Sequence, residues 1–184
     1  MAERGCFGLK ARQSPMATIP QSLLDKIIPA ADIGRRDWKD ARPMVFTNGV
    51  FDLLHSGHVL YLAAARELGA TLLVAVNSDD SARQLAKGPE RPLNSERDRA
   101  LVIAALQSVS YVSLFEEATP CELMRRCRPD VYVKGADYDI EALEETRLVR
   151  GWGGRALALP LLAGYSTTAL VQRIRGHDCM PLTR

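Results

Sequence analysis

The sequence has few of the residues that mark several common classes of protein. Its 184 residues include four cysteines, and none of them forms a CxxC pair, which argues against a disulfide framework and a common zinc site. No run approaches the roughly 20 apolar residues that a transmembrane helix needs, and no segment resembles a signal peptide. These absences predict a reduced, soluble protein of the cytoplasm.

An excess of positive charge is also missing. The chain has 24 Lys and Arg against 22 Asp and Glu, a net charge of +2, so nothing in its balance indicates nucleic acid or an anionic membrane as a partner. Neither the GxxxxGK[ST] nor the GxGxxG motif occurs, which disfavours P-loop kinases and Rossmann dehydrogenases. Of the three histidines, His55 and His58 lie three positions apart.

From residue 43 onward, short apolar runs alternate with segments of helix length. This pattern is typical of βαβ units and predicts an α/β fold, a Rossmann-like doubly wound five-stranded parallel sheet in a single domain. We expect strands at Met44–Thr47, Leu72–Val76, Tyr111–Leu114, Val131–Lys134 and Ala156–Leu159. We expect helices near Gly57–Leu68, Ser95–Gln107, Pro120–Arg126, Ile140–Val149 and Thr168–Arg175. Such sheets bind ligands beyond the carboxyl ends of their strands, here in the loops after Thr47, Val76 and Lys134.

The two ends of the chain differ in character from this central part. Residues 1–20 mix glycine, proline and charge without periodicity, and we expect a flexible leader there. Residues 21–42 should form a short helical extension, with a helix near Ser22–Ile28 that Trp38 docks onto the domain. The main domain would then span residues 43–176 and a C-terminal tail residues 177–184.

The stretch FTNGVFDLLHSGH places His55 and His58 directly after an apolar strand and a glycine turn. Residues three apart share one face of a helix, so both imidazoles can reach one spot if a helix begins near Ser56. That spot is a helix N-terminus, which attracts phosphate. Gly49 allows a tight turn, and Gly57 lets a phosphate approach the backbone. We predict a phosphate-binding site with two imidazole donors, which suits a displacement reaction at phosphorus. The alternative is that the two histidines only cap the helix or are polar surface residues.

The same stretch resembles the opening signature of the HxGH nucleotidyltransferases. The similarity continues through VAVNSDDSARQLAKGPERPLNSERDRALVIAALQSV, PDVYVKGADYDIEAL and GYSTTALVQRIR, and it covers roughly residues 43–175. The combination of KGPERPLN, VKGADY and GYSTT is most similar to the heptose 1-phosphate adenylyltransferases of lipopolysaccharide-core synthesis. The resemblance implies a nucleotidyltransferase domain that joins a sugar 1-phosphate to the AMP part of ATP and releases pyrophosphate.

The resemblance also implies roles for the matching residues. His55 and His58 would hold the triphosphate and stabilise the transition state, and Lys87 would neutralise phosphate charge. Substrates would contact Thr47, Asn48, Gly49, Phe51, Asp52, Lys134, Asp137, Ser166, Thr167 and Thr168. Structural roles are the alternatives for several of these residues. Lys87 could be a solvated loop lysine, Asp52 could orient a turn, Lys134 and Asp137 could form an ion pair, and the three hydroxyls could only cap a helix.

Two other functions stay open at this point. A cytidylyltransferase acting on glycerol 3-phosphate or a similar alcohol phosphate would use the same phosphate-binding site, and a non-catalytic nucleotide-binding regulatory module would need only the binding part of it. We expect Mg²⁺ to arrive with ATP and to bind through the substrate phosphates, without a cage of protein ligands. The expected partners are ATP and a sugar 1-phosphate, and the resemblance suggests a homodimer.

Overall fold

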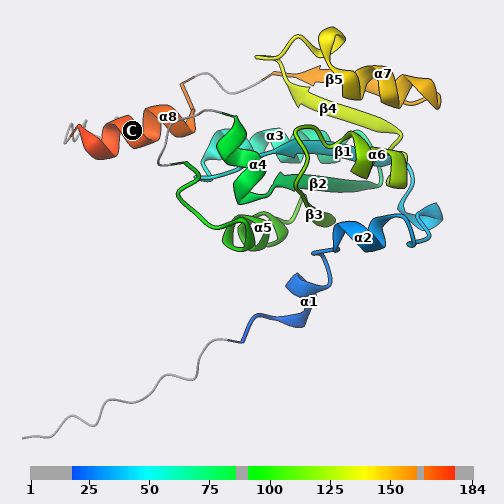
Figure 1. Ribbon diagram of the computed structural model, residues 1–184, viewed down its shortest axis with the longest axis horizontal. Coiled ribbons are helices and arrows are strands. Elements are labelled where there is room, and N and C mark those ends of the chain that lie inside the picture. The colour runs from blue at the N-terminus through cyan, green and yellow to red at the C-terminus, as the bar shows by residue number, and fades with distance from the viewer. Residues whose placement is uncertain (1–17, 86–90, 161–163, 177–184) are drawn as a thin grey trace, which may run out of the picture.

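A five-stranded sheet forms the centre of the structure, a computed structural model that describes residues 18–85, 91–160 and 164–176 (Figure 1). All strands are parallel, in the order β3-β2-β1-β4-β5. They are β1 (Met44–Gly49), β2 (Thr71–Asn77), β3 (Tyr111–Phe115), β4 (Val131–Gly135) and β5 (Arg155–Leu159). The predicted α/β class and all five predicted strands are confirmed, each strand being one or two residues longer than expected.

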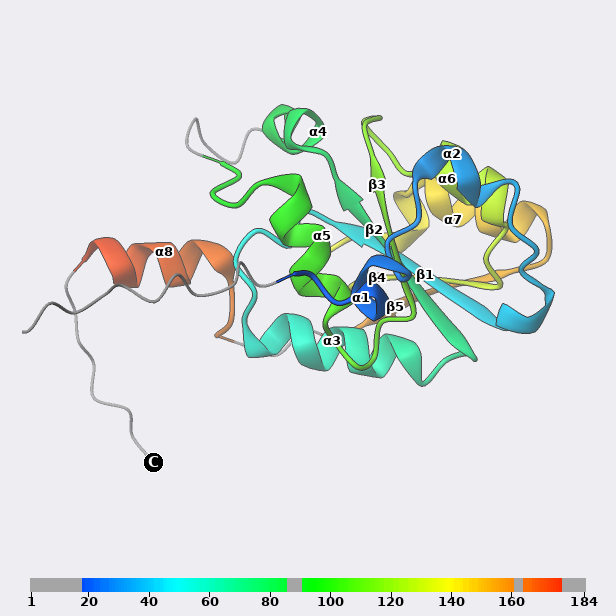
Figure 2. The same cartoon turned by 90° about the horizontal axis from the view of Figure 1, so that it is seen from below.

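Helices cover both faces of this sheet (Figure 2). One face packs on α3 (Ser56–Arg66) and α5 (Glu96–Ala104), and Val45 and Val74 belong to this first core. The opposite face packs on α2 (Ala30–Ile33), α6 (Cys121–Cys127) and α7 (Glu144–Gly151), and Phe46 and Tyr132 belong to this second core. Because parallel strands alternate their side chains between two covered faces, the central strands read as continuous apolar runs.

Four of the predicted helices are interrupted or shorter in the structure. Of these, α3 ends two residues earlier than expected and α5 three residues earlier. The N-terminal helix α1 spans only Gln21–Leu24, because Ile27 instead pairs with Val112 of β3. The segment predicted as a helix over Ile140–Val149 divides into a 3-10 helix, η2 (Ile140–Ala142), and α7. Leu143 separates the two with an extended backbone, since its side chain packs against the second core.

Two α-helices were not predicted individually: α2, which lies within the expected helical extension, and the helix after β2. α4 (Asp79–Gln84) has only six residues and no apolar periodicity, and the Ser78 hydroxyl caps it by accepting a hydrogen bond from the Ser81 amide. At the start of α5, the Ser95 hydroxyl caps the helix in the same way by accepting a hydrogen bond from the Asp98 amide. The last helix, α8 (Thr167–Arg175), begins one residue earlier than expected and projects from the body of the domain (Figure 1).

The N-terminal extension is docked on the domain by polar and aromatic contacts. Trp38, just before the short 3-10 helix η1 (Lys39–Ala41), is buried; its indole donates to the Ile33 carbonyl and its ring packs edge-on against Tyr111. The amine of Lys26 donates to three carbonyls at the end of α5 and just beyond it, those of Ala104, Leu106 and Val109. Residues 1–17 of the predicted leader and the predicted tail, 177–184, lie outside the described residues. Within the described residues, no helix is long and apolar enough to cross a membrane.

Candidate active site

The junction between β1 and α3 forms the centre of the site. α3 begins at Ser56, and His55 flanks its N-terminus with an extended backbone. The rings of His55 and His58 stack with their centroids 3.9 Å apart and their planes inclined by 20°. Phe51 packs edge-on against His58, with 5.4 Å between the ring centroids. The two imidazoles, hereafter the histidine pair, therefore lie together at a helix N-terminus, as their spacing predicts.

Burial influences the protonation of His55. It lowers the pKa of His55 below its ordinary value, which favours the neutral ring at neutral pH. The Nδ1 atom of His55 is buried and makes no hydrogen bond within the described parts of the chain. A bound triphosphate would bring negative charge close to the ring and favour the imidazolium form. The charge of His55 thus depends on whether a ligand occupies the site.

A cavity of about 640 Å³ opens in front of the histidine pair at the carboxyl edge of the sheet. This volume suits a small-molecule ligand. The loops after β1, β2 and β4 and the start of α8 contribute to its wall. The structure brings together these predicted residues: Asn48, Gly49, Phe51, Asp52, His55, His58, Lys134, Asp137, Ser166, Thr167 and Thr168. Lys87 lies outside the described residues.

Thr47 is not among the residues that line the cavity, although its neighbours Asn48 and Gly49 are. Its side chain is fully buried, and its hydroxyl shares a 2.8 Å hydrogen bond with the Tyr61 hydroxyl. Successive residues of a strand point to opposite faces of the sheet; Phe46 faces the second core, so Thr47 faces α3, which carries Tyr61. Thr47 supports Tyr61, and Tyr61 lines the cavity.

The carboxylate of Asp52 is occupied by protein donors. It accepts hydrogen bonds from Arg91 at 2.7 Å and from the backbone amides of Leu93 and Asn94 at 2.8 and 2.9 Å. Burial alone would raise the pKa of Asp52, but these hydrogen bonds outweigh it and lower the pKa below its ordinary value. The contacts join the loop after β1 to the segment that leads into α5, so the geometry favours an orienting role for this aspartate.

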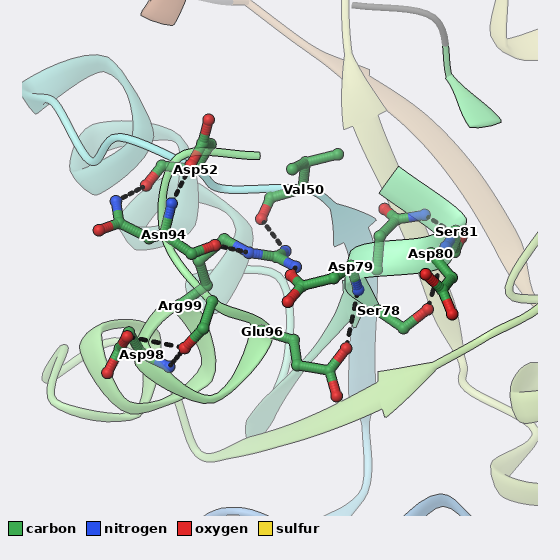
Figure 3. A network of polar contacts seen from close by, with 12 residues as sticks. Val50, Asp52, Ser78, Asp79, Asp80, Ser81, Asn94, Glu96, Asp98 and Arg99 are labelled. Carbon is green, nitrogen blue, oxygen red and sulfur yellow. Dashed lines mark hydrogen bonds and ion pairs between the residues drawn. The ribbon is translucent and has the colours of Figure 1, made fainter. Parts of the chain in front are cut away.

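Arg99 joins three parts of the cavity wall from behind (Figure 3). Its side chain has no exposed surface. The guanidinium donates to the Val50 carbonyl at 2.7 Å, to the Asn94 carbonyl at 3.1 Å and to the Asp79 carboxylate at 2.7 Å. These acceptors belong to the loop after β1, the segment before α5 and the start of α4. A single buried cation thus holds these three segments in a fixed relation.

The cavity wall formed by β4 carries a second polar cluster. The amine of Lys134 donates to the backbone oxygen and to the side-chain oxygen of Asn48, both at 3.0 Å. The hydroxyl of Tyr132 donates to the same side-chain oxygen at 3.2 Å, and the Lys134 amine lies 4.9 Å from the ring centroid of Tyr138. β4 therefore fixes Asn48 and sets a lysine amine in the cavity wall.

The start of α8 lies against the start of α3. Ser166 caps α8 by accepting a hydrogen bond from the Ala169 amide, and the Thr167 hydroxyl donates to the Leu53 carbonyl at 3.4 Å. A Cβ atom added to Gly57 would lie 3.0 Å from the His55 ring and 3.1 Å from Cβ of Tyr165. Two helix N-termini therefore meet at the histidine pair, and both attract anions.

The donor groups present suit phosphate better than a caged metal ion. Within residues 18–85, 91–160 and 164–176, no group of three or more His, Cys, Asp or Glu side chains is arranged to hold a metal. Asp137 is exposed and lines the cavity. One such carboxylate fits the usual binding of Mg²⁺, which keeps several waters and coordinates mainly substrate phosphates.

Several residues of the site were not predicted from the sequence, notably Tyr132, Arg99 and Glu145. Both charged residues lie on helices, where charge normally indicates a solvated surface. Their helical spacing from buried apolar residues could have indicated them. Arg99 lies four residues before Ile103, on the face of α5 that packs on the sheet. Glu145 lies four residues before Val149 on the corresponding face of α7. A charged residue on an apolar helical face indicates a buried polar contact.

Comparisons with known proteins give a matching family and similar sequences. A family model described as cytidylyltransferase-like matches residues 46–173. A D-beta-D-heptose 1-phosphate adenylyltransferase from Bordetella bronchiseptica is 59% identical over 134 residues, which cover 73% of this chain and 83% of that protein. The bifunctional protein HldE from Magnetococcus marinus is 55% identical over 131 residues, 71% of this chain but 27% of that longer protein.

A solved structure shows a similar fold. The crystal structure of the lipopolysaccharide core biosynthesis protein from Thermoplasma volcanium superposes with a TM-score of 0.55 at 28% sequence identity. The match covers 65% of this chain and 95% of that one. The two proteins therefore have a similar fold over most of the shorter chain.

Proposed function

Because this chain belongs to the cytidylyltransferase-like family of HxGH nucleotidyltransferases, we propose that it transfers the adenylyl group of ATP to heptose 1-phosphate. The products are ADP-heptose, a precursor for the lipopolysaccharide core, and pyrophosphate. The identity of 59% to the Bordetella adenylyltransferase, across 83% of that protein, supports the choice of nucleotide and acceptor. Both substrates are metabolites of the cytoplasm, and we place the reaction there.

The reaction is a displacement at the α-phosphorus of ATP. An oxygen of the sugar 1-phosphate forms a bond to this phosphorus, the bond from the phosphorus to the oxygen that bridges it to the β-phosphorus breaks, and pyrophosphate leaves with that oxygen. Negative charge grows on the leaving pyrophosphate and spreads over the equatorial oxygens. The stacked histidine pair at the N-terminus of α3 supplies donors at the place where this charge develops. This arrangement is the observation that carries the proposal.

Other residues of the cavity wall would hold the substrates. Ser166, Thr167 and Thr168 open α8 beside the histidine pair and would contact the triphosphate, because a helix N-terminus favours phosphate. Lys134 would add a positive charge from β4, and Lys87 would neutralise phosphate charge. Asn48, Gly49 and Phe51 would contact the nucleotide and the acceptor.

Magnesium completes the proposed substrate set. Mg²⁺ would enter with ATP and would reduce the charge of the triphosphate when bound. Asp137 is the carboxylate of the β4 loop that would assist it, since this side chain is exposed and lines the cavity. A homodimer stays a prediction, and sedimentation of the purified chain would test it.

A cytidylyl transfer to glycerol 3-phosphate is the second candidate, because the matching family is described as cytidylyltransferase-like. The experiment that separates the two measures pyrophosphate release with ATP and with CTP, each against heptose 1-phosphate and glycerol 3-phosphate. We expect release with ATP and heptose 1-phosphate. Release confined to CTP with glycerol 3-phosphate would replace the proposal, and nucleotide binding without release in any pair would indicate a regulatory module.

A further inference from the structure

We propose that Glu145 binds ring hydroxyls of the sugar acceptor and thereby contributes to its selection. This inference rests on the proposed adenylyl transfer to a heptose phosphate. Glu145 lies in the first turn of α7, its side chain belongs to the cavity wall, and the residue is 6% exposed. Its carboxylate is not used by the chemistry at phosphorus and has no hydrogen-bond donor among the residues that the structure describes.

Glu145 differs from the neighbouring acidic residue in its surroundings. Within the described parts of the chain, no hydrogen bond or ion pair reaches its oxygens. The adjacent Glu144 differs, because its carboxylate is about half exposed and lies 3.5 Å from Arg125. A buried carboxylate is unfavourable unless donors replace its lost water. A ligand that brings hydroxyl groups into the cavity would supply them.

The position of Glu145 separates it from the phosphate-binding site. The histidine pair packs with Phe51 on the side of the first core, whereas Leu143 and Val149 of the Glu145 segment pack on the second core. After the effect of burial itself, the charge of Glu145 adds to the rise in the pKa of Tyr132, whose hydroxyl bonds to Asn48. The carboxylate therefore lies near the carboxyl end of β4, on the other side of the sheet edge from α3.

The geometry of displacement at phosphorus assigns a substrate to that side. Attacking and leaving oxygens lie roughly in line through the α-phosphorus. If pyrophosphate leaves toward the histidine pair and α8, the acceptor enters from the opposite side, where Glu145 lies. A carboxylate accepts hydrogen bonds from two neighbouring hydroxyls at once, and such charge-assisted bonds are strong. A heptose ring presents neighbouring hydroxyls of this kind, and so does the ribose of ATP. The experiment must therefore distinguish binding of the heptose from binding of the ribose.

The test compares Glu145→Gln with Glu144→Gln as the matched control. Both changes remove one negative charge from the same turn of α7 and keep the side-chain size. For each protein we would measure KM for heptose 1-phosphate at saturating Mg–ATP, and the Kd for ATP by titration calorimetry without acceptor. Glu145→Gln should raise KM for the sugar phosphate about 10- to 100-fold, the effect of weakening hydrogen bonds to a charged group. ATP affinity should stay within about twofold, and Glu144→Gln should leave both constants unchanged within about twofold.

A thermal melt of each protein without ligands completes the test. Because no donor among the described residues pairs with the Glu145 carboxylate in the cavity wall, removing its charge should leave the Tm equal to or above that of the wild type. Unchanged KM for the sugar phosphate would overturn the inference, as would a loss confined to ATP affinity, which would assign the carboxylate to the ribose. A large drop in Tm would overturn it too by revealing a structural role. Wild-type turnover confined to CTP with glycerol 3-phosphate would instead reject the proposed function, and the inference with it.

Discussion

Replacing Arg99 tests whether the buried network of Figure 3 determines the shape of the cavity. Arg99→Met keeps a long flexible side chain on the inner face of α5 but removes the guanidinium. Asp79 then loses its ion pair at 2.7 Å, and the carbonyls of Val50 and Asn94 lose a donor each. The loops after β1 and β2 would lose one of the contacts that join them to the segment that enters α5, while the hydrogen bonds of Asp52 and of the Asp79 amide remain.

The magnitude follows from the burial of these groups. Removing one partner of a buried ion pair costs about 3–5 kcal/mol, and an unsatisfied carbonyl costs about 1–3 kcal/mol. The Asp79 side chain is 26% exposed, so water would solvate part of its charge after the change. We therefore expect a total loss of about 3–5 kcal/mol rather than the sum of the separate costs. That loss is large against the roughly 5–15 kcal/mol that stabilise an ordinary domain.

The assay is urea unfolding at 25 °C, followed by fluorescence, together with kcat/KM for ATP at a temperature where the variant is folded. Arg97→Met is the control, since Arg97 is an exposed neighbour on the same helix and makes no hydrogen bond or ion pair with any residue that the structure describes. Arg99→Lys keeps the charge but lacks the planar fork, and should be intermediate. Arg99→Met should lower kcat/KM as well as stability, because the displaced loops carry Asp52 and the wall beside it.

The result that would refute this reasoning is specific. A free energy of unfolding for Arg99→Met within about 0.5 kcal/mol of the wild type is what an ordinary surface substitution produces. It would mean that the guanidinium does not hold the three segments together. A stability loss with unchanged kcat/KM would show that the network stabilises the fold without shaping the site.

Three further predictions concern the histidine pair and its surroundings. His58→Ala should lower kcat by about 10²–10³ with a much smaller change in ATP affinity, measured by steady-state kinetics and calorimetry; equal losses in both would indicate a binding role alone. Gly57→Ala should leave the Tm unchanged or raise it, since alanine favours helix by about 1 kcal/mol, yet lower kcat/KM about tenfold or more by displacing the His55 ring; wild-type activity would contradict the close packing. Asp52→Asn should lower the Tm at pH 7. Because the folded pKa of Asp52 is below its ordinary value of 3.8, its contribution is present above that value and is lost as the pH falls through the lowered pKa. The difference in Tm between the two proteins should therefore shrink in melts below pH 4, and a constant difference would assign the effect to packing.

The fold was predictable wherever a strand is buried on both faces. β1 and β2 read as apolar runs that no exposed segment would contain, so their existence and order along the chain follow from composition. α4 was missed because five polar residues and a single alanine carry no apolar periodicity, and its stability comes from the Ser78 cap and the contact of Asp79 with Arg99. The end of the N-terminal helix was also missed, since the pairing of Ile27 with Val112 is a long-range contact that no local pattern encodes.

The site also contains some features that local sequence predicts and others that depend on long-range contacts. The histidine pair was predictable because a helix start and a three-residue spacing are local properties. The surroundings of Asp52 were not, because Arg91, Leu93 and Asn94 reach it from about forty positions away in the chain. Thr47 shows a finer limit, since its motif suggests ligand contact while the alternation of the strand turns its side chain toward Tyr61.

The pairing of the N-terminal extension with β3 has a consequence for how the chain behaves among its neighbours. β3 is the last strand at one margin of the sheet, and an open margin exposes amides and carbonyls on which another polypeptide can assemble. Here the Val112 amide donates to the Lys26 carbonyl and the Ile28 amide donates to the Val112 carbonyl. The extension thus pairs with the exposed edge of β3. Its removal would leave the backbone amides and carbonyls of this edge open for pairing with another chain.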